Sequence, residues 1–468
     1  MDKIKFGTDG WRAIIARDFT EANVARAAEG TALWLKKNFK TPSIVIGHDC
    51  RFAGQMFAHV TANVMAAHNI QVFIANKFVS TPMISFGAKT YGASVGVIIT
   101  ASHNPPSYNG YKLKSEHGGP LSPEKVQEVE DLIPEKCSVN YTDSDFDKNV
   151  TSGKIKIVAL EDDYVKHIEK SFDLEAIKKS GIKLAYDAMY GAGQNVMKRI
   201  LPDTLFLHCE YNPSFMGQAP EPIHKNLIEF SNLIKSKGNI ECGIATDGDA
   251  DRIGLYNSRG EFIDSHHIIL LLIHYLCKYK NLKGKVVTAF STTPRIAKIC
   301  KHYNLELQTV KIGFKYIAGI MVEEDVLVGG EESGGIAIKG HIPERDGIWM
   351  GLVIAEFLAK SGKKLDDLIA EVYEITGSFA FERNDLHIEE TQKQNIIKAC
   401  QNKSYDHFGT YKVDRLEDLD GYKYFLGNDE WIMIRPSGTE PVLRLYAESS
   451  TQAGAFKILE ETKKQILV

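Results

Sequence analysis

Three carboxylates recur at alternate positions in one short stretch. Asp247, Asp249 and Asp251 are separated by single small residues, and Arg252 follows directly. Carboxylates this close repel one another unless a cation neutralises them, and oxygen-only ligands suit Mg²⁺ or Ca²⁺. An EF-hand loop would need Gly at its sixth position and Glu at its twelfth, where this chain has Arg252 and Ser258. The alternative is a solvated acidic turn, but the pattern favours a divalent-metal site.

A serine follows an apolar run in the first third of the chain. Ser102 lies in the polar stretch 100–106, directly after the apolar residues 95–99. A serine held in a loop at the end of a buried strand can act as a nucleophile or as a phosphate carrier. By itself the stretch is equally an ordinary Ser/Asn/Pro turn. No G-x-S-x-G pattern surrounds Ser102, which disfavours an esterase. His103 adjoins the serine and can either hydrogen-bond a phosphoryl oxygen or play a structural part.

Two later stretches suit a phosphorylated sugar. Residues 329–335 combine four glycines with Glu331 and Glu332. Carboxylates accept hydroxyl protons and glycines let a ring come close, although a flexible turn has the same composition. Residues 435–441 offer a guanidinium, two hydroxyls and exposed amides, which suits a phosphate. No G-x-x-x-x-G-K-[ST] loop occurs, so an ATP-driven kinase is disfavoured.

Alternating strands and helices must position these loops. A helix is predicted over 21–38, because Thr20 can cap it and its apolar residues share one face. Further strand-helix units are predicted over 183–247 and 286–329. Their apolar runs read as buried parallel strands, and open α/β sheets bind ligands at the carboxyl ends of such strands. The sequence therefore predicts α/β layers with the polar loops at one edge.

The last part of the chain differs, because short strands at 431–434 and 442–447 surround the loop 435–441 in an α+β style. The predicted fold class is α/β, with three similar α/β domains and a C-terminal α+β domain around a central cleft. The expected domains are 1–150 with the serine loop, 151–257 with the metal loop, 258–377 with the sugar loop and 378–468 with the phosphate loop.

Composition limits the possible partners. The chain has 468 residues, more than a single hydrophobic core usually serves, and its formal charge of -4 provides no field to attract nucleic acid or an anionic membrane. It shows no apolar signal core and no run of about 18 apolar residues, so a cytoplasmic location is expected. The seven cysteines are scattered without a C-x-x-C pair and are expected to be reduced.

Taken together, the four loops resemble those of the α-D-phosphohexomutase family of phosphoglucomutases and phosphomannomutases, and are closest in motif to the phosphoglucomutases. The resemblance spans the whole chain, beginning with residues 6–12. It implies that Ser102 is the phosphoserine and that one Mg²⁺ is bound by Asp247, Asp249, Asp251 and a phosphoserine oxygen. It also implies a hexose 1,6-bisphosphate as activator and intermediate.

The resemblance extends to further residues. Catalytic roles are implied for Ser102, His103, Lys112, Arg12 and Arg252. Substrate contacts are implied for Lys315, Glu331, Ser333, His341, Arg435, Ser437, Gly438 and Thr439. Lys112 is expected to transfer a proton once burial or a neighbouring cation lowers its pKa. Many relatives end the sugar motif with a histidine where this chain has Gly335, and Lys315 or His341 are the candidates to compensate.

The implied reaction interconverts a hexose 1-phosphate and a hexose 6-phosphate through phospho-Ser102. Residues 331–333, together with His341 and residues 346–347, look more like the glucose-preferring branch, so glucose phosphates are expected. Phosphomannomutase and phosphoglucosamine mutase activities remain alternatives, because the gluco and manno sugars differ by the orientation of one hydroxyl. The expected partner is a phosphorylated hexose, with no nucleic acid and no membrane, and both a monomer and a homodimer stay open.

Two other classes of protein are compatible with single loops. A metal-dependent phosphatase would hydrolyse phospho-Ser102, but it has no need for separate sugar and phosphate loops. A phosphosugar-binding protein without catalysis would keep the fold, but intact Ser102, Lys112 and metal-loop aspartates argue against that alternative.

Overall fold

The computed structural model describes residues 3–7, 9–436 and 442–467. The chain forms two compact units. The N-terminal unit comprises Met1–Lys285 and Gly313–Leu368, and the C-terminal unit comprises Val286–Ile312 and Ile369–Val468. The metal, serine and sugar loops all belong to the N-terminal unit.

The first sheet of the N-terminal unit has six strands in the order β1-β5-β4-β2-β3-β6. These strands are β1 (Trp11–Ile14), β2 (Ser43–His48), β3 (Gln71–Ala75), β4 (Val95–Ile99), β5 (Tyr108–Ser115) and β6 (Ile155–Val158). Strands β4, β2, β3 and β6 run parallel, whereas β5 and β1 are antiparallel to their neighbours. β6 lies beyond residue 150, the predicted end of the first domain, yet it pairs with β3.

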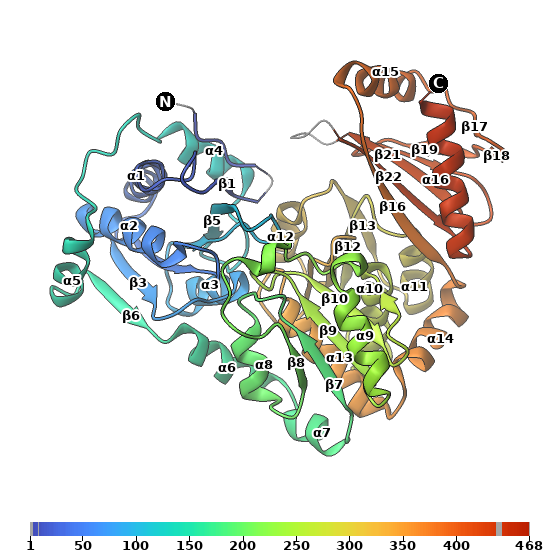
Figure 1. Cartoon of the computed structure of the whole chain (residues 1–468), viewed down its shortest axis with the longest axis horizontal. Helices are drawn as coiled ribbons and strands as arrows, with labels where there is room; N and C mark the ends of the chain where they lie inside the picture. The colour runs from blue at the N-terminus through green and yellow to red at the C-terminus, as the bar shows by residue number, and fades with distance from the viewer. Residues whose placement is uncertain (1–2, 8, 437–441, 468) are drawn as a thin grey trace. The chain divides into compact units, whose positions relative to one another are not determined.

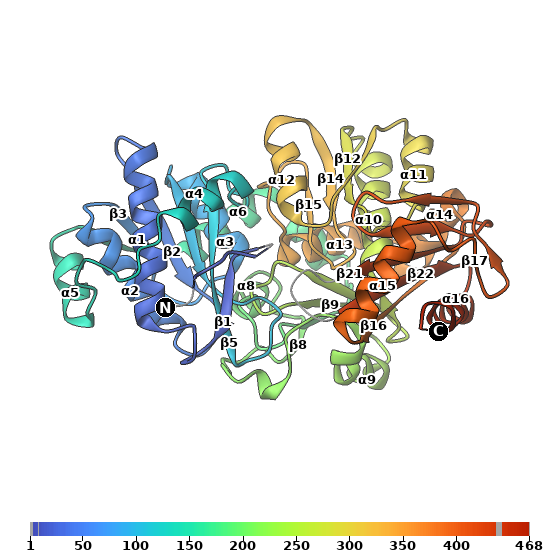
Figure 2. The ribbon, with the colours of Figure 1, turned by 90° about the horizontal axis from the view of Figure 1, so that it is seen from above.

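Helices cover both faces of this sheet (Figures 1 and 2). α1 (Glu21–Asn38) has the predicted bounds, and the Thr20 hydroxyl oxygen accepts the N–H of Asn23 at its start. Ile44 and Ile46 of β2 join the core formed with α1 and α2 (Gly54–Ala67). Gly47 points the other way, because a Cβ there would lie 2.8 Å from Ile84 of α3 (Thr81–Thr90). This alternation follows the two-residue period of a strand. Three further helices accompany this sheet: α4 (Pro123–Asp131), α5 (Asp143–Thr151) and α6 (Leu160–Ser171).

The second sheet has the order β11-β10-β9-β7-β8. Its strands are β7 (Leu184–Asp187), β8 (Leu205–Leu207), β9 (Cys242–Thr246), β10 (Ile253–Asn257) and β11 (Phe262–Ile263), accompanied by α7 (Leu174–Lys179), α8 (Gln194–Ile200) and α9 (Ile228–Lys237). β7, β8 and β9 are parallel, whereas β10 returns antiparallel to β9. The metal loop, residues 247–252, makes the tight connection between β9 and β10.

The sugar loop joins β14 (Val326–Gly330) to its antiparallel neighbour β15 (Ile336–Ile338). Gly334 in this loop has a φ of +90°, and a Cβ there would lie 2.6 Å from the carbonyl oxygen of Ile253. Glycine is therefore needed for the close approach of the sugar loop to the start of β10. The remaining elements of this unit are α10 (Ser265–His274), a π-helical turn (Tyr275–Tyr279), α12 (Phe314–Glu323) and α13 (Gly347–Ser361).

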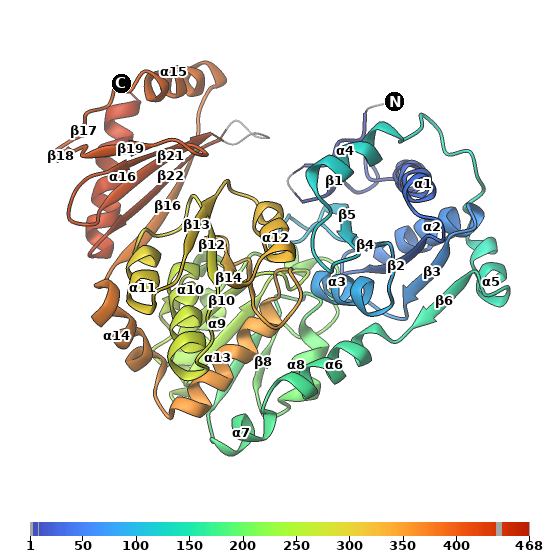
Figure 3. The same cartoon turned by 180° about the vertical axis from the view of Figure 1, so that it is seen from behind.

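The C-terminal unit contains two pieces of sheet. β12 (Lys285–Ala289) and β13 (Leu307–Val310) are parallel and are connected through α11 (Arg295–Tyr303). An antiparallel sheet of order β16-β22-β21-β20-β19 follows. Its strands are β16 (Ala380–His387), β19 (Arg415–Glu417), β20 (Tyr422–Phe425), β21 (Trp431–Pro436) and β22 (Val442–Ser449). α16 (Gln452–Ile466) packs against β16 and β22 (Figure 3). The smaller elements are α14 (Leu365–Thr376), which leads into this unit, α15 (Glu390–Gln401), and the pair β17 (His407–Phe408) and β18 (Tyr411–Lys412).

These elements confirm the predicted fold class of α/β domains followed by an α+β domain, with sheets that are mixed rather than purely parallel. No helix in the described part of the chain is both long and apolar enough to cross a membrane. None of the seven cysteines, all of which are described, is in a disulfide; Cys137 is half-buried and the others are buried.

Candidate functional site

Ser102 lies three residues beyond the end of β4 and touches the metal loop. Its hydroxyl donates to Asp247 Oδ2 over 2.7 Å, and the Nδ1 atom of His103 lies 3.3 Å from the same Oγ. The backbone of Ser102 is left-handed, with a φ of 51°, and the residue is buried. The two loops come from neighbouring sheets of the N-terminal unit, so the fold places a candidate phosphate carrier against a carboxylate cluster.

The metal loop is a cluster of buried oxygens. Asp247, Asp249 and Asp251 are fully buried, and one carboxylate oxygen of each lies within 4.8 Å of the others. Within the described residues, the Oδ1 atoms of Asp249 and Asp251 have no hydrogen-bond partner. Burial and repulsion by the other two carboxylates raise the pKa of Asp247 well above its usual range. Unpartnered carboxylate oxygens in an all-oxygen donor set fit a hard divalent cation.

Lys112, on β5, supplies a positive charge beside this cluster. Its buried Nζ lies 2.8 Å from Asp249 Oδ2 and 3.3 Å from Asp251 Oδ2. A third carboxylate, Asp9, approaches Nζ to 2.9 Å. Burial opposes the charge of Lys112, but these three carboxylates outweigh it and raise the pKa. The expectation that burial or a neighbouring cation lowers the pKa of Lys112 is therefore not met in this structure, because anions surround the ammonium group.

Arg345 is a second buried cation at the cluster, and the sequence analysis did not single it out. Its Nη2 atom lies 2.6 Å from Asp9 Oδ2 and 2.8 Å from Asp251 Oδ2. A Cβ at Gly335 would come within 2.5 Å of Arg345 Cδ. The space that a side chain at position 335 would need is thus filled by Arg345.

The two other predicted arginines also lie at the site. Arg12 Nη1 donates to the Asn104 side chain in the serine loop over 2.6 Å, and Arg252 Nη1 lies 3.7 Å from Glu221. Burial, followed by the charges of Arg252 and Arg12, lowers the pKa of His103 well below its usual range. His103 is therefore a neutral imidazole at neutral pH.

Glu331 lies in the sugar loop, where its Oε1 accepts the N–H of Gly313 over 2.9 Å. Burial raises the pKa of Glu331 to about 7, although nearby Arg345 lowers it. Ser333, two residues further on, is half-buried.

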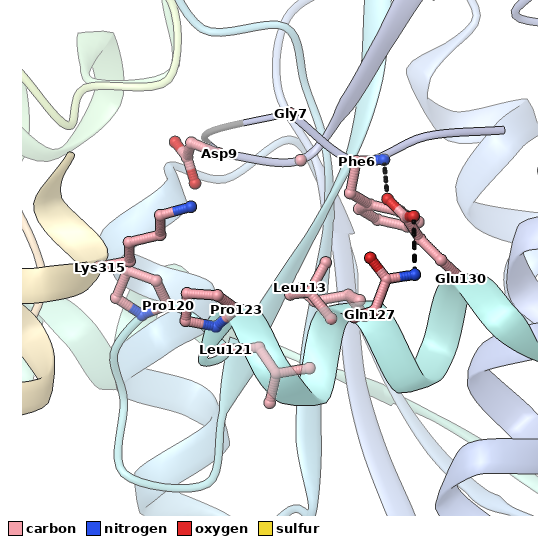
Figure 4. A pocket seen from close by; sticks show the side chains of 12 residues that line it. Phe6, Gly7, Asp9, Leu113, Pro120, Leu121, Pro123, Gln127, Glu130 and Lys315 are labelled. Carbon is pink, nitrogen blue, oxygen red and sulfur yellow. Dashed lines mark hydrogen bonds between the residues drawn. The ribbon is translucent and has the colours of Figure 1, made fainter.

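A cavity of about 190 Å³ adjoins this region. Its lining includes Phe6, Leu113 and Gln127, and the side chain of Lys315 extends across it toward Asp9 (Figure 4). Asp9 contacts both Lys112 and Arg345, so Lys315 and the metal cluster border a common carboxylate.

His341 makes contacts of a different kind. Its ring stacks on Trp349, with centroids 3.7 Å apart, and its Nε2 lies 2.9 Å from Asp346 Oδ2. These partners surround a side chain with no exposed surface. Its predicted contact with a sugar stays a prediction.

The predicted phosphate loop belongs to the C-terminal unit. Arg435 is half-buried at the end of β21, with its Nε 3.2 Å from Asp420 Oδ1. Ser437, Gly438 and Thr439 lie outside the described residues.

A buried serine hydroxyl against a cluster of three carboxylates, flanked by buried cations, is the arrangement expected of an enzyme that transfers phosphoryl groups by positioning and charge neutralisation. Comparison with family models identifies the branch within this class. Models described as phosphoglucomutase/phosphomannomutase match the chain at 3–139 (alpha/beta/alpha domain I), 162–260 (domain II), 264–375 (domain III) and 397–465 (C-terminal domain). The chain belongs to the phosphoglucomutase/phosphomannomutase family, the α-D-phosphohexomutases, and is an intramolecular phosphotransferase.

Its relatives carry several substrate names. A phosphoglucomutase/phosphomannomutase of Thermococcus kodakarensis is 29% identical over 97% of this chain and 96% of its own. A phosphoglucosamine/phosphogalactosamine mutase of Sulfurisphaera tokodaii is also 29% identical, over 98% of each chain. A solved structure from Thermus thermophilus, provisionally named phosphomannomutase, is 30% identical with a TM-score of 0.88, and all of both chains is covered.

Proposed function

We propose that this enzyme interconverts α-D-glucose 1-phosphate and glucose 6-phosphate through phospho-Ser102 and glucose 1,6-bisphosphate, using one Mg²⁺. The observation that carries the proposal is the 2.7 Å contact between Ser102 Oγ and Asp247. Through this contact the serine joins a cluster in which Asp249 and Asp251 each keep an oxygen without a partner in the described part of the chain.

Asp247, Asp249 and Asp251 would hold Mg²⁺ together with a phosphoryl oxygen on Ser102. When bound, the ion offsets negative charge on the phosphoryl group during its transfer. The three aspartates fit this role because their mutual repulsion, which raises the pKa of Asp247, is relieved by a cation.

The cycle has two transfers. In the first, the bond between phosphorus and Ser102 Oγ breaks while phosphorus bonds to the C6 oxygen of glucose 1-phosphate, and the C6 hydroxyl proton ends on the released Ser102 Oγ. His103 Nδ1, 3.3 Å from Ser102 Oγ, is placed to hold a proton at that oxygen. After the bisphosphate turns around, Ser102 Oγ takes the phosphoryl group from C1 while its proton passes to the C1 oxygen, and glucose 6-phosphate leaves. Lys112 and Arg345 stay protonated and balance the carboxylates throughout.

Sugar and phosphate contacts complete the proposal. Glu331 and Ser333 would accept hydrogen bonds from hydroxyl groups of the ring. Lys315 and Arg12 would lie near the reacting phosphate. The non-reacting phosphate would be held by Arg435, Ser437, Gly438 and Thr439. Motif likeness supports glucose, whereas the name of the Sulfurisphaera tokodaii relative favours an amino sugar as second candidate.

The test compares wild type, Ser102→Ala and the control Ser107→Ala, an exposed serine five positions later in the same region. Each is incubated with Mg²⁺, a trace of the matching 1,6-bisphosphate, and the 1-phosphate of glucose, mannose or glucosamine. We expect turnover of glucose 1-phosphate that Ser102→Ala lowers by about 10³-fold or more and Ser107→Ala leaves intact.

Two results would change the proposal. Faster turnover of the mannose or glucosamine substrate would keep the mechanism and replace the sugar. Undiminished turnover by Ser102→Ala would exclude a phosphoserine mechanism.

A further inference from the structure

Arg51 lies behind the loop that carries Ser102, with its side chain fully buried. It follows β2, whose last residue His48 pairs with Ile99 at the end of β4. Because these two parallel strands end side by side, Arg51 reaches the serine loop from the neighbouring strand.

The Arg51 guanidinium donates hydrogen bonds to the backbone of this loop. Its Nη1 and Nη2 atoms donate to four backbone carbonyl oxygens over 2.6 to 2.9 Å, those of Ser102, Asn104, Pro105 and Tyr108. Its Nε lies 3.4 Å from Asp49 Oδ2 in a buried ion pair. Four of the five N–H donors of the guanidinium are thus taken by carbonyls. The fifth, on Nε, makes no hydrogen bond within the described residues and lies beside the Asp49 carboxylate, away from the position of a phosphoryl group on Ser102 Oγ. The role of Arg51 therefore differs from that of a substrate-binding arginine.

The same group of residues fixes the other side of Ser102. The Thr100 hydroxyl donates to Asp49 Oδ2 over 2.5 Å, and the Thr100 Oγ1 accepts the N–H of Ser102 over 2.9 Å. Thr100 therefore holds the N–H of Ser102 while Arg51 holds its carbonyl. The backbone of Ser102 has a left-handed φ of 51°, which residues other than glycine rarely adopt. Such a conformation persists where surrounding contacts impose it.

We propose that Arg51 is a positioning residue that holds the Ser102 backbone so that Oγ stays aimed at the metal cluster through both phosphoryl transfers. This inference rests on the proposed phosphoserine function. Lysine cannot replace Arg51, because one ammonium group with three donors cannot span four carbonyls and Asp49.

The test substitutes Arg51→Lys, with Arg26→Lys as matched control. Arg26 is also buried in the same part of the chain, where it bonds Pro134 and Asn23. A misplacement of about 1 Å costs about 10²-fold in rate. We expect Arg51→Lys to lower kcat by about that factor with KM changed less than threefold, and Arg26→Lys to change kcat less than threefold. After incubation with glucose 1,6-bisphosphate, intact mass should show less phosphate on Arg51→Lys than on either wild type or the control.

A second pair of variants tests the same inference independently, in case Arg51→Lys does not fold. Thr100→Val removes the acceptor for the Ser102 N–H, and its control is Thr61→Val, a buried threonine whose hydroxyl bonds only Phe57 O among the described contacts. Thr100→Val should reproduce the loss of kcat and of Ser102 phosphate, and Thr61→Val should not.

Crystal structures of the variants separate this inference from the proposed function. Departure of residue 102 from the left-handed region in Arg51→Lys or Thr100→Val supports positioning, even if wild type turns over none of the sugars. A kcat of Arg51→Lys within threefold of Arg26→Lys, or an unchanged Ser102 conformation in both variants, would overturn the proposal.

Discussion

Lys112 and Arg345 show how single residues balance charge at this site. Both cations are buried and contact Asp9, and both also contact Asp251 of the metal loop. Asp9 and Asp251 therefore share two buried cations, while Asp249 and Asp251 each keep one oxygen to which no described residue donates. The cations stabilise the folded cluster without occupying the atoms that suit a metal.

Glu331 provides a pH-dependent prediction at the residue scale. Burial raises its pKa to about 7, so the folded protein binds a proton that the unfolded chain releases near its ordinary value. The associated loss of stability is absent below about pH 4.5, grows as pH rises through 7 and is complete at about pH 8. Glu331→Gln should therefore raise the free energy of unfolding at pH 8 by up to about 3 kcal/mol relative to pH 5.

Denaturant melts at both pH values measure this difference. The neighbouring Glu332→Gln is the control, because that side chain is only half-buried. An equal effect of Glu331→Gln at pH 5 and pH 8 would contradict the prediction. If Glu331 also binds the sugar, kcat/KM of Glu331→Gln should fall by about tenfold or more, because an amide is the weaker acceptor for a hydroxyl.

Sequence patterns predicted the residues in short motifs and missed those whose partners are far along the chain. Ser102 and the three aspartates follow apolar strands, and that context is visible in the sequence. Arg345 meets Asp9 across 336 positions, and nothing local signals the pairing. Arg51 stands in a polar turn after β2, but only the fold reveals that four carbonyls of another loop face it. The raised pKa of Lys112 likewise depends on carboxylates from separate elements.

At the scale of elements, the connection between β15 and α13 ties several parts of the N-terminal unit together. Glu344 lies 2.7 Å from Lys114 Nζ on β5 and accepts the Ser85 hydroxyl of α3. Asp346 caps α13 by accepting the N–H of Trp349 over 2.9 Å. Arg345, between them, reaches the metal cluster, so the position of this cation depends on how firmly the connection is anchored.

Tyr164→Phe tests that anchoring. The Tyr164 hydroxyl of α6 donates to Asp346 Oδ2 over 2.6 Å inside the core. Its removal should cost about 1 to 3 kcal/mol of unfolding free energy, because a buried carboxylate oxygen loses a donor. Chemical denaturation measures the loss.

The control for this substitution is Tyr91→Phe, whose hydroxyl donates to the half-exposed Asp163. That change should cost clearly less, since water can replace the hydroxyl. Equal losses from both substitutions would show that the burial of Asp346 has no bearing on stability.

Elements with a clear apolar period matched their predictions. α1 was expected from its cap and its apolar face, and β4, β21 and β22 were expected from their apolar residues. The membership of β6 in the first sheet was not, because β6 lies beyond the predicted boundary at residue 150 and two of its four residues are exposed. Which strand a segment pairs with depends on the fold around it more than on its own side-chain composition.

At the scale of the whole molecule, the C-terminal unit consists of two segments that are far apart in the sequence and are joined by buried polar contacts. Arg295 lies 3.0 Å from Glu448, and Lys423 donates to Thr292 O over 2.7 Å while its ammonium lies 4.0 Å from the centre of the Trp431 ring. These contacts join Val286–Ile312 to the C-terminal sheet. Predicted boundaries that follow the sequence continuously, such as 258–377, cannot express such a division, and they remain predictions.

A metal-dependent prediction belongs to this scale. Mg²⁺ bound by the aspartates would link the loop after β9 to the serine loop, both in the N-terminal unit. Hydrogen exchange should therefore slow at residues 100–104 and 247–252 when Mg²⁺ is added, and β21 and β22 of the C-terminal unit should be unaffected. Mass spectrometry of peptides before and after chelation reads this directly.

Asp251→Asn should abolish the protection, whereas the exposed Asp203→Asn of the same unit should keep it. Slower exchange of equal size in both units would indicate that Mg²⁺ acts elsewhere.

The buried cysteines have a consequence for the chemistry of oxidants. Burial raises the pKa of Cys50, Cys209, Cys242, Cys277 and Cys400, so these thiols carry almost no thiolate at neutral pH. Peroxides attack the thiolate, and the half-buried Cys137 also has its pKa raised, to about 11. Cys50 lies next to Arg51, yet it is sealed in a core cluster with Ala192 and Phe215. Sugar-phosphate interconversion by this chain should accordingly continue through oxidative stress that inactivates enzymes with exposed, acidic thiols.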